Sequence, residues 1–391
     1  MFQIGDTASG LPVVATFGSA RSIAINTNGQ WAFRASFSRF ANDYQEGIWT
    51  EEAGTLNLIA YLGQHAAGLP AGVTYQGLGN PGINSSGKVA FDSYLGGTDS
   101  GYDRAIWSNA YGPLALVART GEHAPGTPDG VNFNDIGWDG LVALNASGDL
   151  VFKGTLSGPG IDYTNNDGVW RQTAGSLSLI ARAGDQAPDL PEGTKFGHLL
   201  NPALNSVGNV VFFAYLSGSE IDLSNFRSLW IADGGKAQLV VRTGQQAPGM
   251  PAGIVFGSVD DTPLLNSAGQ VAFGASLAGE GIDITNDSSI WITDKFGVPQ
   301  LVVREGQQLE VTPGDFRTIA QIYPAGDGGN DDESESAFNA RGQFAFRAYF
   351  TDNTTGIFVS EPTVVPEPGG LTLGLFVIGG ACRRRRTVAH S

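Results

Sequence analysis

Residues 266–273 read NSAGQVAF, an Asn-x-x-Gly turn followed by a short apolar strand that ends in Phe. The same pattern begins at five other asparagines, which are Asn26, Asn84, Asn145, Asn205 and Asn339. Successive copies are 58, 61, 60, 61 and 73 residues apart. A period of about 60 residues predicts a repeat architecture, in which one supersecondary unit is copied along the chain.

Asn at the first position and Gly at the fourth favour a type I turn, with the Gly in the left-handed conformation. In the strand that follows, side chains alternate between faces, so Val271, Phe273 and Ala275 share one face. We therefore predict that the six motif phenylalanines lie in the core. They are Phe33, Phe91, Phe152, Phe212, Phe273 and Phe346.

Two further motifs accompany each turn. An aromatic strand follows, with Trp49, Trp107, Trp170, Trp230, Trp291 or Phe358 at its centre. A strand of the type LIAR then leads into a GQQAPG-like loop. Each unit thus holds about four strands and two hairpins, and no segment shows sustained helical periodicity.

The two ends of the repeat region complement each other. Residues 2–29 match the second half of a unit, and residues 343–362 match the first half. The sequence therefore predicts an all-β fold over residues 1–361, a six-bladed β-propeller of four-stranded repeats closed by its N- and C-terminal strands. The alternative, a straight solenoid, gains nothing from complementary ends. Met1 falls inside the predicted closing strand, so we expect the natural start, with a signal peptide, to lie upstream.

The composition limits the partners. The chain has 391 residues and a net charge of −16, and 4 of its 22 Lys and Arg residues are in the tail. The body alone has 18 basic against 38 acidic residues, a net charge of −20, which phosphate backbones repel; we expect no nucleic-acid partner. Cys382 is the single cysteine, so the body has no disulfide and no thiolate metal site.

The tail has three parts after the body. A linker, residues 362–368, contains Pro366, Glu367 and Pro368. Residues 369–382 are mostly apolar and uncharged and predict a short hydrophobic helix of about 21 Å, below the ~30 Å of a bilayer core. Residues 383–391 begin with a basic cluster, which favours a cytoplasmic C-terminus. The cluster is Arg383, Arg384, Arg385 and Arg386.

These three parts, in this order, resemble the PEP-CTERM sorting signal of Gram-negative bacteria. The resemblance implies export, transient anchoring in the inner membrane and processing by an exosortase-type protease. It also implies display at the cell surface or release, often with exopolysaccharide. The body resembles bacterial tandem-repeat surface proteins named for their NxxGxxAF motif, for which no chemistry is implied.

Three loops between a Phe strand and a Trp strand suggest calcium. One contains Asp162, Asn165 and Asp167, and another contains Asp283, Asn286 and Asp287. Oxygen ligands in a tight loop suit Ca²⁺. The alternative is that Asp and Asn are ordinary turn formers. A weaker copy contains Asp222 and Asn225.

Other polar features have mainly structural readings. The acidic insertion, residues 326–336, is predicted to be a solvated loop, and the alternative is that its carboxylates gather cations. His65 and His123 share one repeat position and would line a central channel; a metal site would need more ligands than these two. A recurring arginine predicts an ion pair or hydrogen bond within each blade. It appears as Arg119, Arg182, Arg242 and Arg304.

The sequence contains no GxSxG, HExxH or P-loop motif, so it does not indicate an enzyme. The leading hypothesis is an exported binding or matrix module associated with exopolysaccharide. A polysaccharide hydrolase or lyase is the alternative, and it predicts non-repeating carboxylates at one mouth of the channel. A passive coat protein is the third reading.

Overall fold

The computed structural model describes residues 3–40, 43–98, 103–137, 142–234, 236–324 and 337–361. These residues form 27 strands and no helix, which confirms the all-β prediction. Within them, no helix is long and apolar enough to cross a membrane. The hydrophobic helix predicted at residues 369–382 lies outside the described residues.

The strands form six antiparallel sheets in chain order, here called sheets 1 to 6. Sheet 1 contains β1 (Thr16–Ile25), β2 (Trp31–Ser38), β3 (Gln45–Glu52) and β4 (Thr55–Tyr61). Sheet 2 contains β5 (Thr74–Leu78), β6 (Gly82–Ile83), β7 (Val89–Gly96), β8 (Arg104–Ser108) and β9 (Ala115–Arg119). Sheet 3 contains β10 (Asn132–Ile136), β11 (Ala143–Leu144), β12 (Leu150–Ser157), β13 (Asp167–Thr173) and β14 (Ser176–Arg182).

Sheet 4 contains β15 (Lys195–Leu204), β16 (Val210–Ser217), β17 (Arg227–Ala232) and β18 (Gln238–Arg242). Sheet 5 contains β19 (Val255–Val259), β20 (Leu264–Leu265), β21 (Val271–Ala278), β22 (Ser288–Thr293) and β23 (Pro299–Arg304). Sheet 6 contains β24 (Gln308–Thr312), β25 (Asp315–Pro324), β26 (Ala345–Phe350) and β27 (Thr355–Val359).

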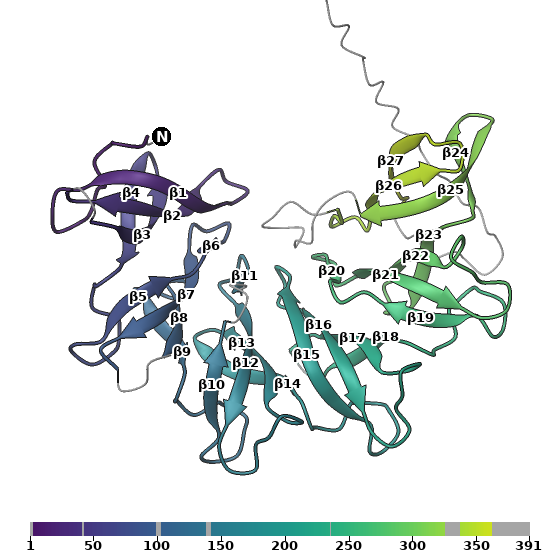
Figure 1. Cartoon of the computed structure of the whole chain (residues 1–391), viewed down its shortest axis with the longest axis horizontal. Helices are drawn as coiled ribbons and strands as arrows, with labels where there is room; N and C mark the ends of the chain where they lie inside the picture. Colours follow the sequence, from purple (N-terminus) through teal and green to yellow (C-terminus); the bar gives the residue numbers. More distant parts are fainter. Residues whose placement is uncertain are drawn as a thin grey trace, which may run out of the picture.

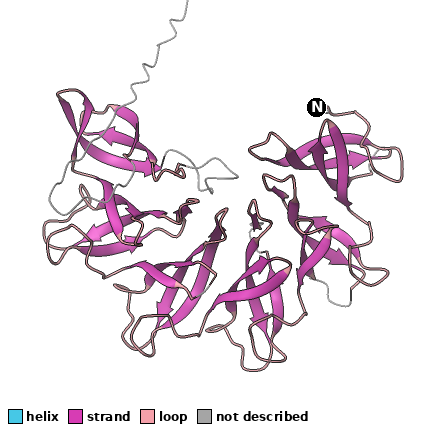
Figure 2. Cartoon of the chain, turned by 180° about the vertical axis from the view of Figure 1, so that it is seen from behind, coloured by secondary structure: helices cyan, strands magenta, loops and turns pink. Residues whose placement is uncertain are grey.

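The sheets follow one another around an open arc, with their faces turned toward each other like blades (Figure 1). Strands run between an inner rim and an outer rim, and the short strands β6, β11 and β20 lie at the inner rim. The propeller-like arrangement of antiparallel sheets is therefore confirmed. Figure 2 shows the same arc from behind, with sheets 1 and 6 on opposite sides of its opening.

The predicted ring closure is wrong for the described residues. There, the N-terminal segment bonds to its own sheet, through the Thr7–Thr16 bridge and the Trp49 indole, whose Nε1 donates to Ser9 O. In sheet 6, a hairpin of β24 and β25 supplies the fourth strand. This hairpin replaces the GQQAPG loop of the other units, so sheet 6 gains its fourth strand without the N-terminus.

The motif turns form as the sequence predicts. In each, the Gly amide donates to the Asn carbonyl, and all six motif glycines have φ between 72° and 91°. The asparagine side chains also join the repeats. Asn84 Nδ2 donates to Asn145 O at 2.9 Å, and Asn145 Nδ2 donates to Asn205 O at 2.9 Å. The series runs unbroken from Asn26 to Asn339 along the inner rim.

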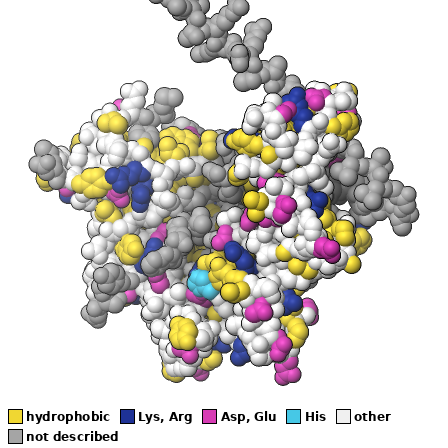
Figure 3. Space-filling view, turned by 45° about the vertical axis from the view of Figure 1, so that its right-hand side comes forward, with side chains coloured by type: hydrophobic (Ala, Val, Ile, Leu, Met, Phe, Trp, Pro, Cys, Tyr) yellow, Lys and Arg dark blue, Asp and Glu magenta, His cyan; other side chains and the backbone are white. Residues whose placement is uncertain are grey.

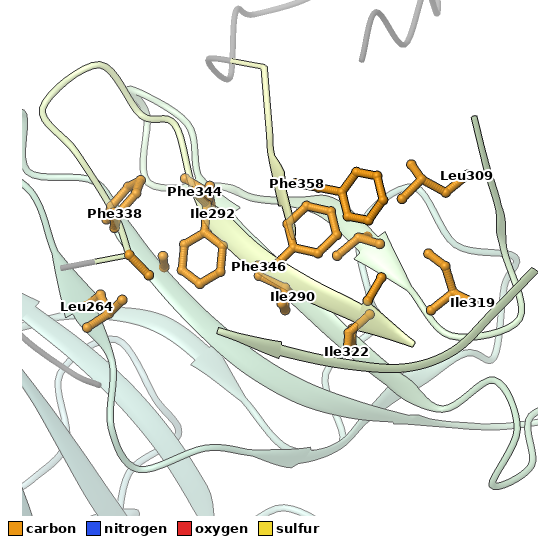
Figure 4. Packing of buried hydrophobic residues seen from close by; sticks show 14 of the residues in the cluster. Leu264, Ile290, Ile292, Leu309, Ile319, Ile322, Phe338, Phe344, Phe346 and Phe358 are labelled. Atoms are coloured by element: carbon orange, nitrogen blue, oxygen red, sulfur yellow. The ribbon is translucent and has the colours of Figure 1, made fainter. Parts of the chain in front are cut away.

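The core lies between the sheets. All six motif phenylalanines are at most 3% exposed, which confirms their predicted role, and the five motif tryptophans are fully buried. Within a repeat, Phe and Trp rings stack, as in Phe152 and Trp170 at 6.1 Å. Figure 4 shows the junction of sheets 5 and 6, where Ile290 and Ile292 meet Ile322, Phe344 and Phe346. Because neighbouring sheets share these clusters, each repeat is stabilised by the next.

Candidate functional site

The predicted calcium loops are closed turns at the outer ends of their strands. Asp162 Oδ1 accepts bonds from Thr164 N at 2.8 Å and Thr164 Oγ1 at 2.6 Å. Asn165 Oδ1 accepts from Asp162 N, and Asn165 Nδ2 donates to Gly160 O. The two bonds from Thr164 lower the pKa of Asp162, and the Thr164 hydroxyl has the larger effect. The turn thus brings Asp162 and Asn165 together and uses both side chains.

Asp167 is not part of that turn, because it starts β13 and its carboxylate contacts His198 and Lys153. The second loop repeats the geometry, with Asp283 accepting from Thr285 and Asn286 bonded to Gly281 O. Asp287 lies past the turn, where its charge helps to raise the pKa of Glu305, a shift caused mainly by burial. Among the described residues, no three His, Cys, Asp or Glu side chains gather as metal ligands. Calcium binding stays a prediction.

The same loops carry a feature that sequence reasoning missed. The residue after each loop aspartate is a large apolar side chain that points into solvent. Tyr163 is 90% exposed, Leu223 86% and Ile284 88%. Three consecutive repeats therefore present an apolar side chain at one position, and we call these three residues the rim knobs.

The two repeat-equivalent histidines serve their own loops. His65 Nδ1 lies 3.2 Å from Val73 O, and His123 Nδ1 lies 3.0 Å from Val131 O. In the next repeat, Gln186 takes this role and binds backbone groups of its loop. These bonds tie the position to its own loop, and a channel-lining role stays a prediction.

Two of the recurring arginines make the predicted ion pairs. Arg119 Nη2 lies 2.7 Å from Asp103 Oδ2, and Arg182 Nη2 lies 2.8 Å from Asp185 Oδ1. The acidic insertion and the tail lie outside the described residues, and so do the sorting residues. These are Pro366, Glu367, Pro368, Arg383, Arg384, Arg385 and Arg386.

The most varied chemistry lies where one sheet meets the next. Two positions per repeat face the following sheet: the residue after the motif Phe and the residue three before the motif Trp. We call them the junction positions. In sheets 1 to 5 they hold Arg34 and Glu46, Asp92 and Arg104, Lys153 and Asp167, Phe213 and Arg227, and Gly274 and Ser288. The scaffold residues repeat, whereas these residues differ in charge and size at every junction.

At the junction of sheets 3 and 4, Lys153 and Asp167 meet His198 of β15. His198 Nδ1 contacts Asp167 Oδ2, and Lys153 Nζ lies 3.5 Å from the same oxygen. Lys153 Nζ also lies 3.4 Å from His198 Nε2. The Asp167 side chain is 5% exposed and the His198 side chain 51%. A buried carboxylate thus orients an imidazole that reaches solvent, an arrangement capable of proton transfer.

The preceding junction holds a buried ionic cluster. Arg104 Nη2 lies 3.0 Å from Asp92 Oδ2, and Arg104 Nη1 lies 3.5 Å from Asp135 Oδ1 of sheet 3. Burial raises the pKa of Asp92, and the Arg104 charge opposes this shift. These ion pairs link the two sheets, while Asp92 Oδ1 and Arg104 Nε are buried without a hydrogen-bond partner among the described residues.

Arginine side chains also lie at the junction of sheets 1 and 2 and at the junction of sheets 4 and 5. Arg34 Nη1 donates to Leu78 O of sheet 2. At the junction of sheets 4 and 5, the Arg227 guanidinium lies over the Phe213 ring, 5.4 Å from its centroid. Figure 3 shows acidic side chains as separate spots on the visible face rather than one patch.

The junction of sheets 5 and 6 is open. Because Gly274 and Ser288 are small, a pocket of about 180 Å³ remains there. Its polar lining includes Ser258, Asp260 and Ser276, and its apolar lining includes Ile322 and Phe344. Sequence analysis missed this site, although the sequence contains one signal for it. The residues at the junction positions differ between repeats, whereas the motif residues beside them stay the same.

Comparisons with known proteins concern fold and family. A search of curated proteins finds no match. An oligogalacturonate lyase in complex with manganese is 11% identical, with a TM-score of 0.40 over 90% of this chain and 82% of that one. The polysaccharide lyase Uly1 is 8% identical, with a TM-score of 0.34 over 86% of this chain and 76% of that one.

The β-propeller domain of the trilobed protease from Pyrococcus furiosus, which has an open velcro topology, is 11% identical. Its TM-score is 0.25, over 88% of this chain and 95% of that one. A family model matches the chain twice, over residues 1–186 and 140–372. The two matches together span nearly the whole sequence, so the chain belongs to the family of unknown function DUF7453.

Proposed function

We propose that this protein is a surface-displayed polysaccharide-binding module, built as six blades on one repeated scaffold. The observation that carries the proposal is the contrast between constant core positions and variable junction positions. A coat protein needs only the constant part. Different polar groups at each junction suit a partner that itself presents different groups along its length, as a heteropolysaccharide does.

The accessibility of the junction groups supports the same proposal. The His198 side chain is half exposed, and the pocket between sheets 5 and 6 is lined by hydroxyl groups, a carboxylate and apolar side chains. This mixture is typical of a site that binds sugar rings through their hydroxyl groups and their C–H faces. The acidic body favours neutral over acidic polymers.

The binding test uses affinity electrophoresis of the full-length chain through gels that contain the producing cell's exopolysaccharide. We expect retardation relative to a gel without polymer, and we expect His198→Ala or Asp260→Asn to reduce it. Parallel gels with calcium or chelator test the Asp162 and Asp283 loops. Unchanged mobility in every polymer gel would refute the binding function and leave the passive coat.

A second candidate function rests on the Lys153–Asp167–His198 cluster. An oriented imidazole beside an ammonium group suits a hydrolase or lyase acting on polysaccharide, because one group moves a proton while the other stabilises negative charge. Incubation with the same polymer would yield new reducing ends or unsaturated products. Both His198→Ala and Lys153→Met would abolish them, and wild-type protein that releases no product would exclude this function.

We further propose that the tail directs export and transient membrane anchoring by residues 369–382, followed by exosortase-type processing. The support is the order of Pro366, Glu367 and Pro368, the apolar run and the arginine cluster. The test expresses the chain behind a standard secretion signal in a host with or without exosortase. We expect a shorter surface or released form only in the first host. Replacing Glu367 by Ala would retain the longer form in the membrane.

A further inference from the structure

The junction of sheets 5 and 6 differs from the other junctions because a glycine, Gly274, lines its pocket. A Cβ atom on Gly274 would lie 2.1 Å from Asp260 Oδ2, so the carboxylate occupies the space that a side chain fills in other repeats. Lys153 or Phe213 stands at this position in sheets 3 and 4. Because Gly274 has no side chain, the pocket stays open and the Asp260 carboxylate stays accessible.

The Asp260 carboxylate has no donor of its own. Across the described ranges, no backbone or side-chain group hydrogen-bonds or pairs with it, whereas Asp92 and Asp167 both contact cations. Partial burial raises the pKa of Asp260, the neighbouring Asp261 charge adds to the shift, and the Arg227 charge opposes it without a direct contact. A carboxylate held in this way favours a ligand that brings hydrogen-bond donors.

The remaining lining is suited to such a ligand. Ser258 Oγ and Ser276 Oγ lie 2.8 Å apart at one wall, and Ser288 adds a third hydroxyl group. Leu264, Ile290, Ile322 and Phe344 converge from the two sheets (Figure 4). The lining thus combines an apolar surface with hydroxyl groups and one carboxylate.

The size of the pocket limits the ligand to a small one. Its 180 Å³ lies below the ~300 to 1,000 Å³ of pockets for drug-sized ligands. We propose that this pocket binds one uncharged hexose ring of a polysaccharide, with ring hydroxyl groups donating to Asp260 and the C–H face against Ile322 and Phe344. The carboxylate repels a uronic acid. This inference rests on the proposed polysaccharide-binding function and assigns its sugar subsite.

Isothermal titration of the full-length protein tests the subsite with the methyl glycosides of glucose, galactose and mannose, and with glucuronate. We expect at least one neutral glycoside to bind, and glucuronate to bind at least tenfold more weakly. Asp260→Asn should weaken the neutral sugar at least tenfold. Ser276→Tyr should abolish its binding, because Tyr94 and Tyr215 occupy this position in sheets 2 and 4 without disturbing the fold.

Asp129→Asn is the control, because it removes an exposed carboxylate outside the pocket lining; we expect unchanged sugar affinity. Thermal unfolding verifies that each variant is folded. Sugar binding that survives both Asp260→Asn and Ser276→Tyr, or that prefers glucuronate, would overturn the subsite. Polymer retardation without binding of any hexose would also overturn it while leaving the proposed function standing. Failure of both assays would refute the two together.

Discussion

The side-chain amide of Asn145 donates a hydrogen bond to the backbone carbonyl of Asn205, 2.9 Å away in the next repeat. Its Oδ1 accepts from Asp149 N inside its own turn. One side chain therefore closes a local turn and joins two repeats. Since this happens at five successive junctions, the series sets the spacing of the sheets along the inner rim.

Asn145→Ala should lower the free energy of unfolding by about 2 to 4 kcal/mol, because two buried partners lose their hydrogen bonds. Asn339→Ala is the matched control. Asn339 ends the series, is exposed, and directs Nδ2 to Gln343 of its own turn. We expect a loss of about 1 kcal/mol or less there. Urea unfolding measures the loss of unfolding free energy in both variants. Equal losses would show that the hydrogen bonds between repeats do not add stability.

The Trp230 indole depends on one buried hydroxyl group. Its Nε1 donates to Ser228 Oγ at 2.8 Å, and Ser228 Oγ donates to Ala214 O at 2.7 Å. Ser228→Ala should destabilise the protein by about 1 to 3 kcal/mol, because both groups lose a partner in a dry core. Ser178, exposed in sheet 3, provides the control Ser→Ala change. A Ser228→Ala melting temperature equal to that of the control would contradict this account.

Asp260 should lower stability at neutral pH. Its pKa is raised on folding, so between the ordinary and raised values the folded state binds more protons than the unfolded state, and stability falls as pH rises. Asp260→Asn should therefore raise the melting temperature at pH 7 and give no gain at a pH below both values. A loss of stability at pH 7 would reverse the sign and contradict the prediction.

Asp162 should behave in the opposite way. The Thr164 hydroxyl holds its pKa below the ordinary value, so its contribution is present above the unfolded pKa and is lost as pH falls through the folded pKa. Asp162→Asn should lower the melting temperature at pH 7 and have little effect in acid. Melting curves over the acidic range, with Asp222→Asn as a second copy, measure this. An effect confined to acid would contradict it.

The rim knobs should be dispensable for folding. Changing Tyr163, Leu223 and Ile284 to Ser should alter the free energy of unfolding by no more than about 0.5 kcal/mol per site, because each side chain is almost fully exposed. The triple variant should elute earlier from a hydrophobic-interaction column. Substituting Val151, Val169 and Val211, which are buried, provides the destabilising comparison. Unchanged retention would show that the knobs do not form an accessible apolar row.

The sequence by itself determined the repeat, the turns and the core. Asn-x-x-Gly dictates its turn locally, and the alternation that buries Phe273 follows from strand geometry, so both can be predicted without tertiary information. Only the tertiary structure decided what lies between repeats. The Asn145 amide, the Asp167–His198 contact and the pocket over Gly274 join residues 31 to 61 positions apart or depend on the neighbouring sheet. Such contacts follow from how sheets pack, which no local pattern encodes.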